Sequence, residues 1–209
     1  MMDCKPFRTT CRVGLVLCAA SVLGLSGCHV DADKNNGNEK VNISTPFGGM
    51  SVKTNEDAVG QGVGLTVYPG ATLIKKEHEH DSGAADVNMS FGNFHLGVKA
   101  LSYRTSDSPD KVLAFYRKEM TKFGTVIQCE GNHSVGTPDT TQDGLTCADD
   151  EHSHPQIHVD EDSGEEQLKA GSRRHQHIIA VSTKDGGTKI GMVALDLPGK
   201  FVDGESESQ

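Results

Sequence analysis

The sequence predicts an α+β fold, in which an antiparallel sheet of about six to eight strands is packed by one main helix. Short segments of alternating apolar and polar residues recur along the chain, and turns that contain Gly or Pro separate them. Only one segment, residues 109–123, carries apolar residues at clear helical spacing. Because 209 residues suffice for one ordinary domain with appendages, we expect a single domain over residues 41–197.

Three segments indicate hairpins of the sheet. Residues 41–54 alternate apolar and polar side chains on either side of a Pro-Phe-Gly-Gly turn. Residues 87–100 repeat that outline without gaps, so that Val, Asn, Ser, Val and Lys recur at the same places. Either a duplicated hairpin or a chance similarity explains the repeat, since strands draw on few residue types. A third hairpin is expected over residues 175–196, around an Asp-Gly-Gly turn.

The helix over residues 109–123 has recognisable signals at both ends. Ser108 is a favourable N-cap, and Pro109 suits the first helical position because its missing N–H has no helical partner there. Gly124 can end the helix in the left-handed conformation. An apolar stripe at helical spacing should pack on the sheet, and it consists of Val112, Phe115, Tyr116, Met120 and Phe123.

The N-terminus has the parts of an export signal. A basic segment (1–12) precedes 13 mostly apolar residues (13–25), too few to span a bilayer. Leu25-Ser26-Gly27-Cys28 resembles the lipobox of bacterial lipoproteins. The resemblance implies a signal peptide over residues 1–27 and acyl chains such as palmitate on Cys28. A plain signal peptide, or an uncleaved anchor with a chance Cys, is the alternative.

The same resemblance implies a location in the cell envelope. His29 follows Cys28, where a retention signal for the inner membrane would have Asp. We therefore expect a bacterial protein that is lipid-anchored at the periplasmic face of the outer membrane.

Three further segments are poor in apolar residues. Residues 28–40 are expected to form a flexible tether. Residues 130–166 form a polar, acidic and His-rich excursion, and residues 198–209 a disordered acidic tail.

Two motifs resemble a family of uncharacterised exported bacterial proteins. These are the turn over residues 68–71 (Tyr-Pro-Gly-Ala) and the helix start over residues 108–116, with the pattern Ser-Pro-x-Lys-Val-x-x-Phe-Tyr. The resemblance implies a small α+β domain. Because the family brings no known activity, it identifies no catalytic residue in this chain.

Cys129 and Cys147 are the two cysteines left after the signal peptide and Cys28. In an oxidising compartment such a pair is expected to form a disulfide. Two free thiols are one alternative, and a metal site that also includes His133 and His152 is another.

The chain is rich in histidine, with ten in 209 residues. Imidazole and carboxylate ligands together suit Zn, Ni or Cu ions, so we expect no cofactor other than a weakly bound divalent transition metal. The candidate ligands are His78, His80, His152, His154, His158, His175 and His177. The alternative is that these histidines are solvated and bind nothing.

The net charge and the absence of known catalytic motifs limit the classes of function to consider for this sequence. A net charge of −9 argues against nucleic acid as the main partner, because phosphate contacts need clustered Lys and Arg. The sequence contains no Gly-x-Ser-x-Gly elbow, His-Glu-x-x-His, Walker loop or Cys-x-x-Cys, and we name no catalytic residue. We expect a non-enzymatic lipoprotein that binds an envelope protein or a small ligand, or serves a structural role. The alternative is a periplasmic metal-binding lipoprotein that uses its segments rich in His and acids.

Overall fold

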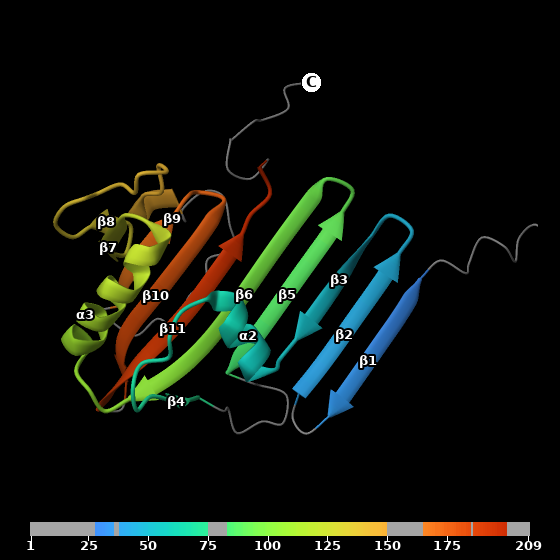
Figure 1. The fold of residues 1–209 in the computed structure, drawn as a ribbon, viewed down its shortest axis with the longest axis horizontal. Coiled ribbons are helices and arrows are strands. Elements are labelled where there is room, and N and C mark those ends of the chain that lie inside the picture. The colour runs from blue at the N-terminus through green and yellow to red at the C-terminus, as the bar shows by residue number, and fades with distance from the viewer. Residues whose placement is uncertain (1–27, 36–37, 75–82, 150–164, 185, 200–209) are drawn as a thin grey trace, which may run out of the picture.

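The chain folds around one broad sheet of eleven strands (Figure 1). The computed structural model describes residues 28–35, 38–74, 83–149, 165–184 and 186–199. The predicted signal peptide, residues 150–164 of the predicted excursion and residues 200–209 of the predicted tail lie outside the described residues.

All strand pairs in the sheet are antiparallel. The order is β1-β2-β3-β5-β6-β11-β10-β9-β7-β8, and β4 pairs separately with β6. The strands are β1 (His29–Asn35), β2 (Asn38–Thr45), β3 (Gly48–Lys53), β4 (Thr72–Leu73), β5 (Ala84–Phe91), β6 (Phe94–Thr105), β7 (Val126–Glu130), β8 (His133–Ser134), β9 (Glu166–Gly171), β10 (His175–Lys184) and β11 (Gly187–Asp196).

The three hairpins predicted from alternation are present. Thr45 pairs with Gly48 across the turn between β2 and β3, and Phe91 pairs with Phe94 across the turn between β5 and β6. Gly92 supplies the positive φ of +57° that the second turn needs. Strands β10 and β11 form the third hairpin. Because β3 pairs with β5, the two hairpins with repeated sequence lie side by side.

Both helices lie on one face of the sheet, which we call the front face (Figure 1). Helix α3 (Pro109–Met120) begins after Ser108, which has the extended backbone of an N-cap, and continues into a 3-10 turn, η1 (Thr121–Phe123). Its buried side chains meet those of α2 (Glu56–Val63) and of the central strands in the main core. The largest fully buried side chains of this core are Tyr116, Leu101, Met120, Leu168, Ile179, Ile190 and Met192.

On the opposite face, the back face, the buried hydrophobic residues form two smaller clusters, one around Ile178 and Val193 of β10 and β11 and one at the β7 edge. There a 3-10 turn, η2 (Cys147–Asp149), lies over β7, and Cys129 and Cys147 are at disulfide distance, with Cα atoms 5.6 Å apart. The Lys169 ammonium donates to the Cys147 carbonyl at 3.3 Å, which provides a partner for this fully buried lysine.

We therefore divide the sheet into a covered half (β6, β7, β9, β10 and β11) and an open half (β1, β2, β3 and β5). In the covered half, core residues are buried on both faces. In the open half, Ala84 and Asp86 of β5 are the buried residues among those described.

Two predictions need correction. Within the described residues, the sheet has eleven strands instead of six to eight, and α2 packs on it in addition to α3. The predicted tether over residues 28–40 instead contains β1 and the start of β2. The physical reason is that β1 is held by its backbone pairing with β2 along seven residue pairs, which needs few apolar side chains.

Candidate functional site

The most distinctive feature outside the core is a polar groove on the front face of the open half. Cross-strand register aligns one side chain from each strand into a row: Asp196, Gly97, Asn88, Ser51, Asn42 and Asp31. A second row, two residues closer to the hairpin turns, contains His95, Ser90, Gly49, Ser44 and His29. The two rows present hydroxyl, amide, imidazole and carboxylate groups on one surface.

The sequence repeat builds this groove. Asn42 and Ser44 of β2 occupy the same places in the first hairpin as Asn88 and Ser90 of β5 in the second. Each Asn-x-Ser segment is a strand, so both polar side chains of a segment point to the same face. Because the two hairpins pair through β3 and β5, the polar surfaces join into one.

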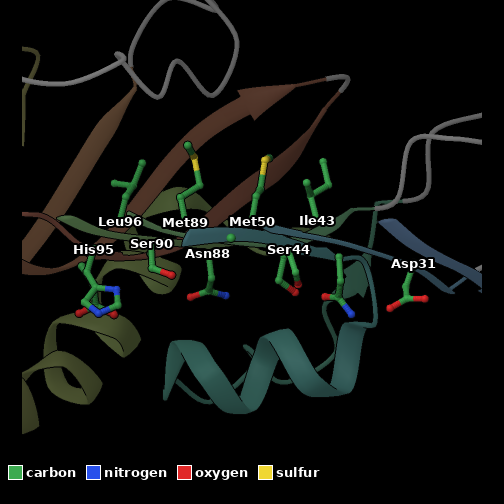
Figure 2. Close-up of a pocket in the computed structure, with 14 residues that line it drawn as sticks. Asp31, Ile43, Ser44, Met50, Asn88, Met89, Ser90, His95 and Leu96 are labelled. Carbon is green, nitrogen blue, oxygen red and sulfur yellow. The ribbon is translucent and has the colours of Figure 1, made fainter. Parts of the chain in front are cut away.

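Figure 2 shows how alternation separates the two faces of these strands. Asn88, Ser90 and His95 point to the side on which α2 lies, whereas Met50 and Met89 point to the opposite side. The groove has a volume of about 530 Å³. Its lining comes from β1, β2, β3, β5, β6 and the end of β11.

Gly97 keeps the floor of the groove low between two polar side chains. A Cβ atom at Gly97 would lie 3.3 Å from Asp196 Oδ2 and 3.4 Å from Asn88 Oδ1. Asn88 in turn donates a hydrogen bond from its amide to the carboxylate of Asp86, which is buried. The bond fixes the orientation of the Asn88 amide and leaves its Oδ1 as an acceptor beside Gly97.

A histidine–aspartate pair stands at the β11 end of the groove. His175 Nδ1 and Asp196 Oδ1 are 2.7 Å apart, and both side chains are largely exposed. Strand pairing brings them together, because His175 lies directly opposite Asp196 and Asp196 opposite Gly97. The pair therefore borders the groove with a carboxylate that can accept further hydrogen bonds.

The groove suits recognition of a polar ligand by several hydrogen bonds. Asn and Ser side chains both donate and accept, so they can match hydroxyl or amide groups of a ligand at several points. Ser90 lies opposite His95 in the register.

The predicted metal ligands are distributed as follows. His78, His80, His152, His154 and His158 lie outside the described residues. His175 and His177 lie two residues apart on the front face of β10, but the His177 ring is half-buried and stacks on Phe123 at 3.5 Å between centroids. Burial lowers the pKa of His177 below its ordinary value. Within the described residues, no group of three or more His, Cys, Asp or Glu side chains is arranged to hold a metal ion.

The other predicted site residues are cysteines. The predicted pairing of Cys129 with Cys147 is present, and both are buried. Cys28 is exposed and directly precedes β1, so no tether separates the predicted lipidation site from the sheet. In the described part of the chain, no helix is long and apolar enough to cross a membrane.

Sequence reasoning did not identify the groove, although one signal for it was available. The repeat of residues 41–54 in residues 87–100 indicated two similar hairpins in the sequence. In the structure, the Asn-x-Ser segment of each hairpin lies in the groove. The contribution of Asp196 was not visible, since it depends on β11 pairing with β6.

Comparisons with protein-family models, with curated proteins and with solved structures found no match to this chain.

Proposed function

We propose that the protein is a lipid-anchored, non-enzymatic binding module of the bacterial cell envelope, which holds an envelope protein or a small ligand in its front-face groove. The observation that carries this proposal is the strand register, which lines the groove with polar side chains of the four open-half strands, of β6 and of the end of β11. These strands bury little, so folding alone does not account for the choice of Asn and Ser there.

The chemistry of the groove favours an uncharged or weakly cationic polar ligand. Asn42, Asn88 and Ser51 supply neutral hydrogen-bonding groups along its centre, and Asp31 and Asp196 stand at its two ends. A carboxylate at each end disfavours anionic ligands. This agrees with the expectation from net charge that nucleic acid is not a partner.

The anchor is proposed from the lipobox-like residues 25–28 together with the position of Cys28. Its side chain is exposed at the very start of β1, where a lipid would be accessible to a membrane. Diacyl or triacyl attachment would give stable anchoring, since each buried methylene contributes about 0.8 kcal/mol. Cys28→Ser should move the protein to the soluble periplasmic fraction or leave its precursor unprocessed. A processed variant that remains in the membrane would contradict the proposed anchor.

Binding in the groove is tested with a photo-crosslinking amino acid that replaces Ser51 in intact cells. The same amino acid in place of Ser134 is the matched control. Ser51 lies in the centre of the groove, whereas Ser134 lies in β8 at the opposite edge of the sheet. We expect a discrete adduct from position 51 that weakens when Asn42→Ala removes a neighbouring amide. Equal adducts from both positions, or none from position 51, would contradict binding in the groove.

Metal binding is a second candidate function, and one observation favours it. Asp196 holds His175 through Nδ1, the arrangement by which carboxylates orient metal-binding imidazoles through the ring nitrogen that is not the ligand. A Zn²⁺ titration of the full chain should then show binding that His175→Gln weakens. Binding unchanged by His175→Gln would remove this site from the candidates.

A further inference from the structure

The back face is apolar over the four strands of the open half and the adjoining end of β6. Cross-strand pairing aligns one apolar side chain from each strand into a single row: Val30, Ile43, Met50, Met89 and Leu96. Figure 2 shows the last four pointing away from α2, on the side opposite the polar groove. No helix lies over this face within the described residues, because α2 and α3 both pack on the front face.

The apolar surface continues into the hairpin turns at one end of the sheet. Phe47, in the turn between β2 and β3, is 84% exposed, and Phe91, beside the next turn, is 44% exposed. The two turns contact one another, because the Gly92 N–H donates to the Phe47 carbonyl at 3.3 Å. Val30 and Ile43, in the row behind them, are 62% and 37% exposed. Four of the large hydrophobic residues that the described structure leaves exposed therefore lie together.

The proposed lipidation site lies at the corner of this surface. Cys28 directly precedes His29, which pairs with Ser44 three residues before Phe47. The start of β1 and the two hairpin turns accordingly lie at the same end of the sheet (Figure 1). Val30, which belongs to the apolar row of the back face, follows Cys28 by two residues.

We propose that this surface, formed by Val30, Ile43, Phe47, Met89 and Phe91 and here called the membrane-contact face, rests against the lipid bilayer beside the acyl chains on Cys28. The inference rests on the lipid anchor of the proposed function. Moving exposed apolar surface out of water is favourable in proportion to the area that is buried. Aromatic side chains such as Phe47 are well suited to the boundary between headgroups and acyl chains.

The bilayer is favoured as the occupant because the anchor keeps it permanently within reach. With no tether between Cys28 and β1, acylation holds the membrane-contact face at the membrane surface at high effective concentration. A second copy of the chain would have to replace that contact. In the proposed orientation the polar groove, on the other face of the same strands, points away from the membrane and stays open to partners.

The test uses the full acylated chain in phosphatidylcholine vesicles that contain lipids brominated on their acyl chains. The chain has no Trp, so Phe47→Trp introduces a single fluorescent probe at the turn. Val135→Trp is the matched control, since Val135 is also exposed, at 43%, but lies next to β8 at the far edge of the sheet. Phe91→Trp is a second probe of the same face, and thermal melting checks that each variant is folded.

We expect the emission of Trp at position 47 to shift to the blue and to lose most of its intensity in brominated vesicles, while the emission from position 135 stays unchanged. Equal, weak quenching of both probes in protein shown by mass spectrometry to be acylated would overturn the membrane-contact face and leave the anchor intact. A blue shift without bromine quenching, together with cross-linked dimers, would overturn it in favour of a second copy. Lack of acylation at Cys28 would overturn the proposed anchor and this inference with it.

Discussion

The covered and open halves of the sheet follow the same strand pattern but differ in what lies against them. In the covered half, the front face packs on α2 and α3, and the back face is closed by its own cluster around Ile178 and Val193 and by η2. In the open half, the strands alternate polar and apolar residues just as regularly, yet only Ala84 and Asp86 of the described residues are buried.

The difference indicates that the open half keeps its pattern for reasons other than burial within the chain. A strand that is paired on both sides needs no continuous apolar face if nothing packs on it. Here the row of apolar side chains stays on one face and the row of polar side chains on the other through the four strands of the open half and into β6. Such regularity is expected when each face meets a different environment, which is the basis of the groove and the membrane-contact face proposed above.

One matched pair of substitutions tests whether the two halves differ in how much their side chains are buried. Ile179 is fully buried in β10, whereas Ile43 lies on the back face of β2 and is partly exposed. Ile179→Ala should lower the free energy of unfolding by about 2–5 kcal/mol through lost burial and a cavity. Ile43→Ala should cost about 1 kcal/mol or less, because the site has little packing to lose. Denaturant unfolding in detergent solution measures both, and equal losses would show that the open half is also covered in the folded protein.

At the far edge of the covered half, a disulfide is expected to contribute stability that burial does not supply. Cys129 and Cys147 are 18 residues apart in sequence and close a polar segment that buries little besides Leu145 and Thr141. Replacing both by Ala should lower the free energy of unfolding by about 3 kcal/mol in the chain-entropy model.

The measurement is the melting temperature of the oxidised protein and of the double variant, each with and without reductant. Reductant should destabilise the former and leave the latter unchanged. A digest without reductant should yield one peptide pair joined through Cys129 and Cys147. Two alkylatable thiols in protein purified from the periplasm would contradict the bridge.

Local signals in the sequence predicted the parts of the fold that depend on nearby residues. The hairpin turns, the extended N-cap at Ser108 and the turn at residues 68–71 are set within a few residues. In that last turn, Gly70 has a φ of +78° and the Ala71 N–H donates to the Tyr68 carbonyl at 2.9 Å, as the Pro-Gly sequence predicts.

The missed elements depend on distant partners. Helix α2 contains Gly60 and Gly62, each of which lowers helix propensity by about 1 kcal/mol relative to Ala. The helix is held instead by Val59 and Val63, which are buried in the main core against distant strands. Strand β1 and the row that joins Asp196 to Asp31 likewise follow from pairing order in the sheet, which alternation within one segment does not reveal.

A smaller effect is expected from one hydroxyl in the core of the covered half. The Tyr116 hydroxyl accepts a hydrogen bond from the Tyr68 N–H at 3.0 Å, and burial raises the pKa of Tyr116, which keeps it neutral. Tyr116→Phe leaves that buried N–H without its acceptor and should lower the free energy of unfolding by about 1–3 kcal/mol.

Tyr68→Phe is the matched control for this prediction. The Tyr68 hydroxyl bonds to Asp107 at 2.8 Å in a less buried place, so its loss should cost less than that of Tyr116. Thermal unfolding of the two variants gives the comparison. The reverse order would place the main hydrogen-bonding contribution at the surface instead of in the core.

The smallest expected effect is a pH dependence at His177, which marks how far burial extends in the covered half. The ring is half-buried, stacks on Phe123 and is hydrogen-bonded to the Val63 backbone. Burial lowers the pKa of His177; Lys122 and His175 act in the same direction, whereas Asp196 and the Val63 hydrogen bond oppose it. The unfolded chain, with a pKa of about 6.5, therefore binds the proton more tightly than the folded protein. Stability should fall as the pH drops through about 6.5 and level off below the folded pKa.

The variant His177→Gln tests this pH dependence. It loses the ring contact at every pH, so only the slope of stability against pH is diagnostic. Melting curves at successive pH values should show a shallower decline in the variant than in the wild type. Parallel declines would show that the His177 ring is as open to protons in the folded protein as in the unfolded chain.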